Sequence, residues 1–283
     1  MTHFEQIAEN LYLLKVPFGP VWTGVTLLTG KENILIDSGA TDEDVEHILI
    51  PALKAMGVEK LHYLINTHSH GDHIGGNFRL RQLMDFRVAA YAGAAPKIED
   101  PVPYAIATRT RFPDYSPAPQ SFLKGVKVDV VLQDGEVLAD RLQVLHTPGH
   151  DDDCVCLLDL PTKTMITGDS LQGNGTVCQG VGFYKSLPDY LYTLDKLEKT
   201  DIQNILCGHD YDGIGYISDE PKKVLSYCRS RVEAYGEFIK AHQSSEPAAI
   251  AQQLIDAHGC GTPERLFMAL YTVTEHLKEI ENV

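Results

Sequence analysis

The segment THSHGDH at residues 67–73 constrains this chain more than any other part of its sequence. It follows directly on the apolar run LHYLIN, which has the length and composition of a buried strand. Three imidazoles and one carboxylate thus stand in a loop that leaves a rigid strand, and these groups bind zinc, iron or manganese. The alternative is an exposed polar turn, which such a concentration of histidine disfavours. The segment therefore predicts a metal site.

Three further apolar segments end in a residue of the same chemical kind. His150 ends LHTPGH, Asp169 lies in TGDS, and His209 lies in LCGHD. Because each comes directly after an expected strand, we expect all of them to emerge at the same sheet edge as the first segment. Seven converging ligands suit two metal ions. The seven are His68, His70, Asp72, His73, His150, Asp169 and His209.

Strands and helices alternate along most of the chain, which indicates an α/β fold. Residues 10–37 contain three short strands, and apolar residues recur at helical spacing over 41–56. A stretch over 92–121 without clear periodicity holds six of the fifteen prolines, so we expect an irregular functional loop or lid there. The remaining expected elements are helices over 77–85 and 187–197 and strands formed by RVAAYA, VKVDVVL, LQVLHTP, CVCLLDL, TMITGDS and NILCGHD.

From Pro221 onward the pattern changes to helices alone. Apolar residues form one stripe at helical spacing over 224–239 and another over 266–280. Pro221, Pro247 and Pro263 each stand where a helix would begin, the position at which a missing N–H costs least. The sequence leaves open whether this tail packs on the core, caps a pocket, joins two copies in a homodimer or forms a winged-helix-like module.

The net charge and the cysteine content indicate which partners the protein can bind and in which cellular compartment it resides. Acidic residues outnumber basic ones 39 to 24 among 283 residues, a formal net charge of −15, which disfavours nucleic acid as a bulk electrostatic partner. No apolar stretch reaches membrane-spanning length, and the N-terminus lacks a secretory pattern. Six cysteines without a framework spacing fit a reducing compartment. We therefore expect a cytoplasmic protein with no membrane partner.

Five short motifs follow one another along the chain: ILIDSG at 34–39, THSHGDHIGG at 67–76, HTPGH at 146–150, TGD at 167–169 and CGHD at 207–210. With these motifs the chain resembles the metallo-β-lactamase-fold hydrolases, and among them the glyoxalase-II-like dinuclear branch. The resemblance implies an αββα four-layer sandwich of two mixed β-sheets with outer helices and with the metals at one edge. We expect residues 1–218 to form this catalytic domain and residues 219–283 a C-terminal helical appendage.

Carried over residue by residue, the resemblance implies two divalent metal ions. Zinc is the first expectation, and the ligands also accept iron or manganese. The resemblance assigns His68, His70 and His150 to a first ion, Asp72, His73 and His209 to a second, and Asp169 to a bridge between them. Asp37 resembles the family's aspartate that hydrogen-bonds the site, with a turn or capping role as the alternative. His146 is not a ligand in the family pattern, so we expect it to be structural.

The resemblance further implies a hydrolase in which a metal-bridging hydroxide attacks a small ester, thioester, lactone or phosphodiester. Asp72 is the expected catalytic residue, since it can ligate one ion and orient the hydroxide. Hydrolysis of β-lactam antibiotics is disfavoured, because zinc β-lactamases carry cysteine or serine at the position of Asp169. We expect the small-molecule substrate to meet Phe18, Trp22 and Tyr184, with Tyr184 as a candidate donor to an oxyanion.

Two functions from other classes stay open. Persulfide dioxygenases resemble this sequence in the same first-site ligands but use one iron bound by two histidines and an aspartate, so a mononuclear-iron oxidoreductase is one alternative. A non-catalytic regulatory protein on the same fold is the other. Metal content, thiol-dependent oxygen uptake and a panel of hydrolysable substrates would separate the three.

Overall fold

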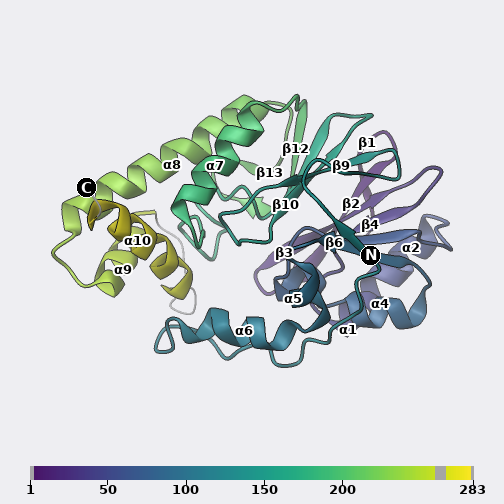
Figure 1. Cartoon of the computed structure of the whole chain (residues 1–283), viewed down its shortest axis with the longest axis horizontal. Coiled ribbons are helices and arrows are strands. Elements are labelled where there is room, and N and C mark those ends of the chain that lie inside the picture. Colours follow the sequence, from purple (N-terminus) through teal and green to yellow (C-terminus); the bar gives the residue numbers. More distant parts are fainter. Residues whose placement is uncertain (1–2, 259–265, 282–283) are drawn as a thin grey trace.

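The computed structural model describes residues 3–258 and 266–281. Two β-sheets pack face to face, and helices cover the outer face of each (Figure 1). This is an αββα four-layer sandwich, so the predicted fold class is confirmed.

The first sheet contains seven strands in chain order, so each strand pairs with the next one along the sequence. Its first strands are antiparallel, whereas β4 to β7 run parallel because helical crossovers connect them. The strands are β1 (Glu5–Ala8), β2 (Leu11–Phe18), β3 (Val21–Leu28), β4 (Ile34–Ile36), β5 (Tyr63–Asn66), β6 (Arg87–Tyr91) and β7 (Val130–Leu132).

The second sheet contains six strands in the order β13-β12-β11-β10-β9-β8. Only the β11–β12 pair is parallel, and helix α7 (Leu187–Glu198) lies in the connection between these two strands. The strands are β8 (Val137–Leu138), β9 (Leu142–His146), β10 (Val155–Asp159), β11 (Thr164–Gly168), β12 (Asn204–Tyr211) and β13 (Gly215–Ser218).

Three main apolar clusters separate the four layers. One lies between the sheets and contains Leu13 of β2 together with Val144 of β9 and Leu157 of β10. Leu14 belongs instead to the cluster beneath the helices of the first sheet, because successive side chains of a strand point to opposite faces. The third cluster joins the second sheet to α7 and to the C-terminal helices. Burial of both faces of the sheets explains the near-continuous apolar runs that predicted the strands.

The helices on the first sheet arise from the segments between its parallel strands. The expected helix over 41–56 consists of α1 (Asp42–Asp44), the π-helical segment η1 (Val45–Leu49) and α2 (Ile50–Ala55). It begins at a capping box, in which the side chains of Thr41 and Asp44 each accept the backbone N–H of the other residue. The next crossover contains α3 (Gly71–Ile74) and α4 (Asn77–Leu83).

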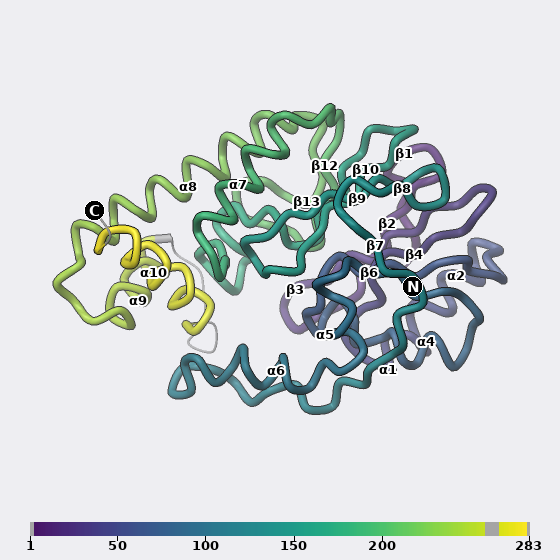
Figure 2. The backbone as a smooth tube through the Cα atoms, viewed as in Figure 1, coloured from purple at the N-terminus to yellow at the C-terminus, as the bar shows by residue number. Residues whose placement is uncertain are grey.

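The expectation of an irregular stretch over 92–121 is wrong in part. This stretch contains α5 (Ala95–Glu99) and α6 (Pro101–Thr110), and α6 runs along the lower edge of the molecule in Figure 2. Pro96 and Pro101 stand in the first turns of these helices. A backbone N–H there has no acceptor within the helix, so proline, which has no N–H, loses no hydrogen bond. Pro96 and Pro101 are therefore helix start signals, whereas Pro113, Pro117 and Pro119 lie in the irregular segment that follows α6.

The chain after β13 is helical, as the apolar stripes predicted. It forms α8 (Pro221–His242), α9 (Pro247–His258) and α10 (Leu266–Glu281), which pack on one another and, through α8 and α10, on α7 (Figure 2). Pro221 and Pro247 begin α8 and α9, whereas Pro263 lies outside the described residues. Among the helices of the described ranges, none is both long and apolar enough to cross a membrane.

We expect Gly149→Ala to lower the free energy of unfolding by about 2–4 kcal/mol, through backbone strain and overpacking together. Gly149 lies in the turn between β9 and β10 with φ +134°, and a Cβ there would lie 2.5 Å from the Cα of Tyr190 in α7. Gly135→Ala is the matched control, because Gly135 has φ +82° but meets no described atom within 4 Å. Urea denaturation of the metal-free variants measures both losses. Equal losses would contradict the role assigned to the helix contact.

Candidate metal centre

The candidate ligands stand where strands of the two sheets end. The first sheet supplies His68 and His70, just after β5, and α3 supplies Asp72 and His73. The second sheet supplies His150 from the turn after β9, Asp169 directly after β11, and His209 near the end of β12. One site is thus assembled from both halves of the sandwich.

The seven side chains form two adjoining groups. The first group contains His68, His70, His150 and Asp169, the second contains Asp72, His73 and His209, and the ligand atoms within each group lie within 4.8 Å of one another. In the first group, His70 Nδ1 is 3.0 Å from His150 Nε2. In the second, His209 Nε2 is 3.2 Å from Asp72 Oδ2. The structure therefore brings together each of the two ligand sets that the resemblance implied.

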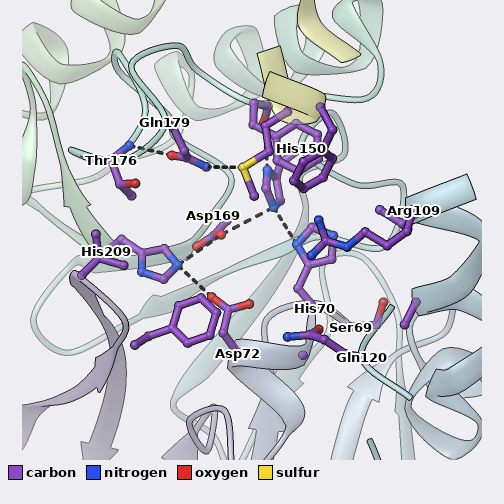
Figure 3. A pocket seen from close by; sticks show the side chains of 18 of the residues that line it. Ser69, His70, Asp72, Arg109, Gln120, His150, Asp169, Thr176, Gln179 and His209 are labelled. Carbon is purple, nitrogen blue, oxygen red and sulfur yellow. Dashed lines mark hydrogen bonds and ion pairs between the residues drawn. The ribbon is translucent and has the colours of Figure 1, made fainter. Parts of the chain in front are cut away.

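Asp169 reaches both groups (Figure 3). Its Oδ2 lies 3.5 Å from His150 Nε2 in the first group and 3.5 Å from His209 Nε2 in the second. Its Oδ1 lies 3.3 Å from His73 Nε2. The Asp169 carboxylate therefore lies between the two sets of imidazoles.

Some of the atoms that face this centre lack a hydrogen bond. His68 Nε2, His73 Nε2 and Asp169 Oδ1 are buried and make no hydrogen bond with any described residue. Leaving such atoms unsatisfied costs about 1–3 kcal/mol each, and a metal ion would satisfy them. Imidazole nitrogens with carboxylate oxygens are a donor set for zinc, iron or manganese. The residues therefore fit a metal-ion site.

On three of the histidines, the ring nitrogen that faces away from the centre is held by a fixed acceptor. Each ring then donates its Nδ1–H outward and presents the Nε2 lone pair to the centre. The contacts are His73 Nδ1 to Asp37 Oδ2 at 2.8 Å, His150 Nδ1 to the Phe183 carbonyl oxygen at 2.8 Å, and His209 Nδ1 to the Trp22 carbonyl oxygen at 2.6 Å.

Asp37 ties the strand ends to one another. It follows β4 with φ +62° and is buried. Its Oδ1 accepts the backbone N–H of Thr67 at 2.9 Å, and its Oδ2 accepts the Thr67 hydroxyl at 2.8 Å as well as the His73 ring. Asp37 therefore hydrogen-bonds a candidate ligand, as the resemblance implied, rather than only ending a turn.

Two imidazoles of the first group, those of His68 and His150, are electrically neutral without an ion. Burial lowers the pKa of His150 to about 3, and the neighbouring His70 acts in the same direction. Burial also holds the pKa of His68 well below its usual value, again with help from the neighbouring rings. These rings are therefore ready to bind a cation at pH 7.

The second group behaves in the opposite way. Burial alone would lower the pKa of His209, but Asp169 and Asp72 outweigh it and raise that pKa to about 10. The pKa of His73 is likewise raised well above its usual value against burial, by Asp169, Asp72 and Asp37. Without an ion these two rings carry protons at pH 7, and the protons take the place of metal charge beside the carboxylates.

A pocket opens over the candidate ligands, and Phe18 lines it as predicted. Tyr104 and Arg109 of α6 form part of its wall, and Arg109 extends toward His70 (Figure 3). The rest of the lining includes His150, Asp169 and His209 at the base and Gln120, Leu123, Phe183, Phe267 and Met268 around them.

Two predicted pocket residues, Trp22 and Tyr184, do not line this pocket. The ring of Trp22 packs edge-on against Tyr216 with centroids 5.4 Å apart, and only the Trp22 carbonyl reaches the site, through His209. Tyr184 is buried, and its hydroxyl lies 2.6 Å from His276 Nε2. The geometry therefore does not place Tyr184 as a donor to an oxyanion.

Some residues of the site had no clear sequence signal. Phe267 and Met268 of α10 reach the pocket from a segment far along the chain, so only the folded structure could assign them. Asp151 hydrogen-bonds His70, with Oδ2 and Nε2 3.0 Å apart. Three aspartates follow His150 directly in the sequence, but no pattern there pairs Asp151 with His70.

Comparison with known proteins agrees with this architecture. Two packed mixed sheets with histidines and aspartates gathered at their strand ends define a class of αββα metal-binding proteins. The profile of the Metallo-beta-lactamase superfamily matches residues 18–209, a range that contains all seven candidate ligands and Asp37. The chain belongs to the metallo-beta-lactamase superfamily.

Curated relatives include thioesterases and a hydroxyacylglutathione hydrolase. An atrochrysone carboxyl ACP thioesterase from Passalora fulva is 25% identical over 75% of this chain and 54% of its own length. A hydroxyacylglutathione hydrolase from Pelagibacter ubique is 26% identical over 57% of each chain. An acyl-coenzyme A thioesterase from Homo sapiens is 31% identical over 51% of this chain and 54% of its own. This chain thus spans about half the length of these relatives.

A solved structure matches nearly the whole chain. A metallo-beta-lactamase family protein from Thermus thermophilus has a TM-score of 0.78 and 22% identity, and the match covers 98% of this chain and 95% of that one. At this identity the likeness supports the fold, including the helices after β13.

At pH 7 we expect an ion that enters the second group to release about two protons, one from His73 and one from His209, because their raised pKa values keep both rings charged. An ion that enters the first group displaces no proton from His68 or His150. Titration calorimetry in buffers of different ionisation enthalpy counts the protons. The variants His68→Ala and His209→Ala each leave one group complete, so equal proton release by the two would contradict this assignment.

We expect Tyr184→Phe to lower the free energy of unfolding by about 1–2 kcal/mol, because it leaves His276 Nε2 buried without its hydrogen-bond partner. Metal content should not change. Tyr192→Phe is the control, since Tyr192 is an exposed tyrosine of α7. Denaturation curves and elemental analysis test both statements, and loss of metal from Tyr184→Phe would contradict the placement of Tyr184 outside the site.

Proposed function

We propose that this chain is a dinuclear metal-dependent hydrolase of thioesters or closely related esters. The observation that carries the proposal is the position of Asp169, whose carboxylate contacts imidazoles of both ligand groups. The names of the relatives support the substrate class, since thioesterases and a hydroxyacylglutathione hydrolase are among them. Lactones and phosphodiesters belong on the same test panel.

Two zinc ions are the proposed native complement, and iron or manganese would suit the same donors. His68, His70 and His150 would hold one ion, Asp72, His73 and His209 the other, and Asp169 both. Bound ions would supply a water of lowered pKa and a Lewis-acid position for the carbonyl oxygen of the substrate.

Asp72 is the residue that we propose for orienting the attacking water. It lines the pocket, so it stands on the side from which a substrate enters. Its Oδ2 accepts a hydrogen bond from the Thr23 hydroxyl at 3.4 Å and lies 3.6 Å from His73 Nε2. These contacts fix the plane of the carboxylate beside the second group.

The pocket wall suits an acyl substrate with a polar part. Phe183, Phe267 and Leu123 offer apolar surface for an acyl chain. The guanidinium of Arg109 lies 4.2 Å from the centroid of the Phe267 ring, and this stacking holds the cation at the wall. We propose that the acyl chain lies along the aromatic side chains and that polar substrate atoms face Arg109.

The experiment that tests the function is reconstitution with zinc, manganese and iron separately, followed by metal analysis and a panel of thioesters, esters, lactones and phosphodiesters. We expect two ions per chain and thioester hydrolysis without oxygen uptake. One iron per chain with thiol-dependent oxygen uptake would replace the hydrolase with the oxidoreductase alternative. A fully loaded protein inert toward the whole panel would favour a non-catalytic role.

We expect Asp169→Ala to bind fewer than two ions and to lose about a thousandfold in kcat/KM, because the carboxylate shared by both groups is gone. His146→Ala is the matched control. His146 hydrogen-bonds the Asp152 carbonyl oxygen at 2.9 Å and stacks on Tyr91 with centroids 4.4 Å apart, away from the ligand groups. Elemental analysis should find two ions in this control, and one ion or none there would count against the ligand assignment.

A further inference from the structure

We propose that Asp151 is a positioning residue for the first metal site, and that its carboxylate holds the His70 ring with Nδ1 turned toward the ion. The inference rests on the proposed metal site but not on the identity of the substrate. Asp151 follows the candidate ligand His150 directly in sequence, and it acts on a different ligand, His70, from the opposite sheet.

The His70 ring is reversed relative to three other candidate ligands. His73, His150 and His209 are each anchored through Nδ1 and present Nε2 to the centre. His70 is anchored through Nε2, which lies 3.0 Å from Asp151 Oδ2, and it presents Nδ1, which lies 3.0 Å from His150 Nε2. A ring used this way must carry its proton on Nε2, and Asp151 is the group that accepts that proton's hydrogen bond.

The carboxylate of Asp151 is itself held rigidly. Its side chain is only 4% exposed, and its Oδ1 accepts the backbone N–H of Asp152 at 2.8 Å. Its Oδ2 also accepts from the Tyr104 hydroxyl and the Lys185 ammonium group, and Lys97 lies 3.4 Å from Oδ1. Partners from α5, α6 and the segment before α7 therefore fix the direction from which the carboxylate meets His70.

Two lysines, Lys97 and Lys185, offset the cost of burying the Asp151 carboxylate. A carboxylate removed from water needs opposite charge and hydrogen bonds around it, and Asp151 has both from Lys97 and Lys185. The Tyr104 hydroxyl also accepts from Lys185 at 2.6 Å, and Tyr104 lines the pocket. The same carboxylate oxygen thus meets a metal ligand on one side and a residue of the substrate pocket on the other.

The second metal group has its own anchor and serves as an internal reference. Asp37 holds His73 there, and the Trp22 carbonyl holds His209. Neither of these two anchors, and no ligand of the second group, contacts Asp151 in the hydrogen bonds and ion pairs of the described residues. Loss of Asp151 should therefore weaken one site and spare the other, whereas a general loss of structure would weaken both.

The test measures metal affinity one site at a time, by competition of zinc with a chromophoric chelator. In a His209→Ala background only the first group is complete, and there we expect Asp151→Ala to weaken zinc binding by about 10–100-fold. In a His68→Ala background only the second group is complete, and there we expect the same substitution to change affinity by less than about threefold. Cobalt in place of zinc adds a second readout, since a displaced His70 changes the visible absorption of the first-site ion.

Asp152→Asn is the matched control, because its side chain is 79% exposed and adjoins Asp151. It should leave both affinities at the values of the parent backgrounds. If Asp151→Ala does not fold, Asp151→Asn keeps the side-chain volume and removes the negative charge. We expect Asp151→Asn to weaken zinc binding at the first site, and Asp151→Glu, which keeps the carboxylate, to weaken it less.

Equal weakening of both sites in folded Asp151→Ala, or no weakening of the first site, would overturn the positioning role. Failure of the proposed hydrolase function would give different results in the wild-type chain. A wild-type chain that binds two zinc ions but hydrolyses nothing would refute the hydrolase and leave the Asp151 result standing. A wild-type chain that binds none of zinc, manganese and iron would refute both.

Discussion

The structure depends on keeping a polar cluster out of water where two apolar sheets meet. His68, His73, His150 and Asp169 are buried, and burial of unpaired imidazoles and carboxylates is costly. The cost is offset in two ways. Outward-facing ring nitrogens meet fixed acceptors, and the inward-facing atoms meet one another around a common centre. The cluster therefore consists of polar groups whose outward-facing atoms are hydrogen-bonded and whose inward-facing atoms form the donor set of the candidate metal centre.

The anchors of this cluster belong to the scaffold rather than to mobile side chains. Two of them are backbone carbonyls, of Trp22 in β3 and Phe183, and a third is Asp37, which is locked to Thr67 at the end of the neighbouring strand. Because the sheets are packed on both faces, these acceptors cannot move independently. The ligand geometry is thus set by the same packing that forms the core, which is why strand ends carry the site.

The fold and the cluster of candidate ligands could be predicted because short local sequence patterns specify both. Apolar runs that stop at histidine or aspartate mark strand ends, and the motifs around His150 and His209 are short. Helix α6 was missed because its prolines resemble loop signals, although proline also begins helices. The roles of Asp151 and Tyr184 depend on partners about 80 to 90 residues away in sequence, His70 and His276, and no local pattern reveals such pairs. These pairs form only when the tertiary packing brings the distant segments together.

The candidate ligands come from segments that no disulfide joins among the described residues. His68 and His70 belong to the first sheet, whereas His150 and His209 belong to the second, and the cysteines described in the structure are all unpaired. An ion held by both sheets would act as a cross-link between the halves of the sandwich, and its binding free energy would add directly to the stability of the fold. A chain deprived of that ion would open more often and meet proteases sooner. The cellular lifetime of this protein would then follow the supply of its metal.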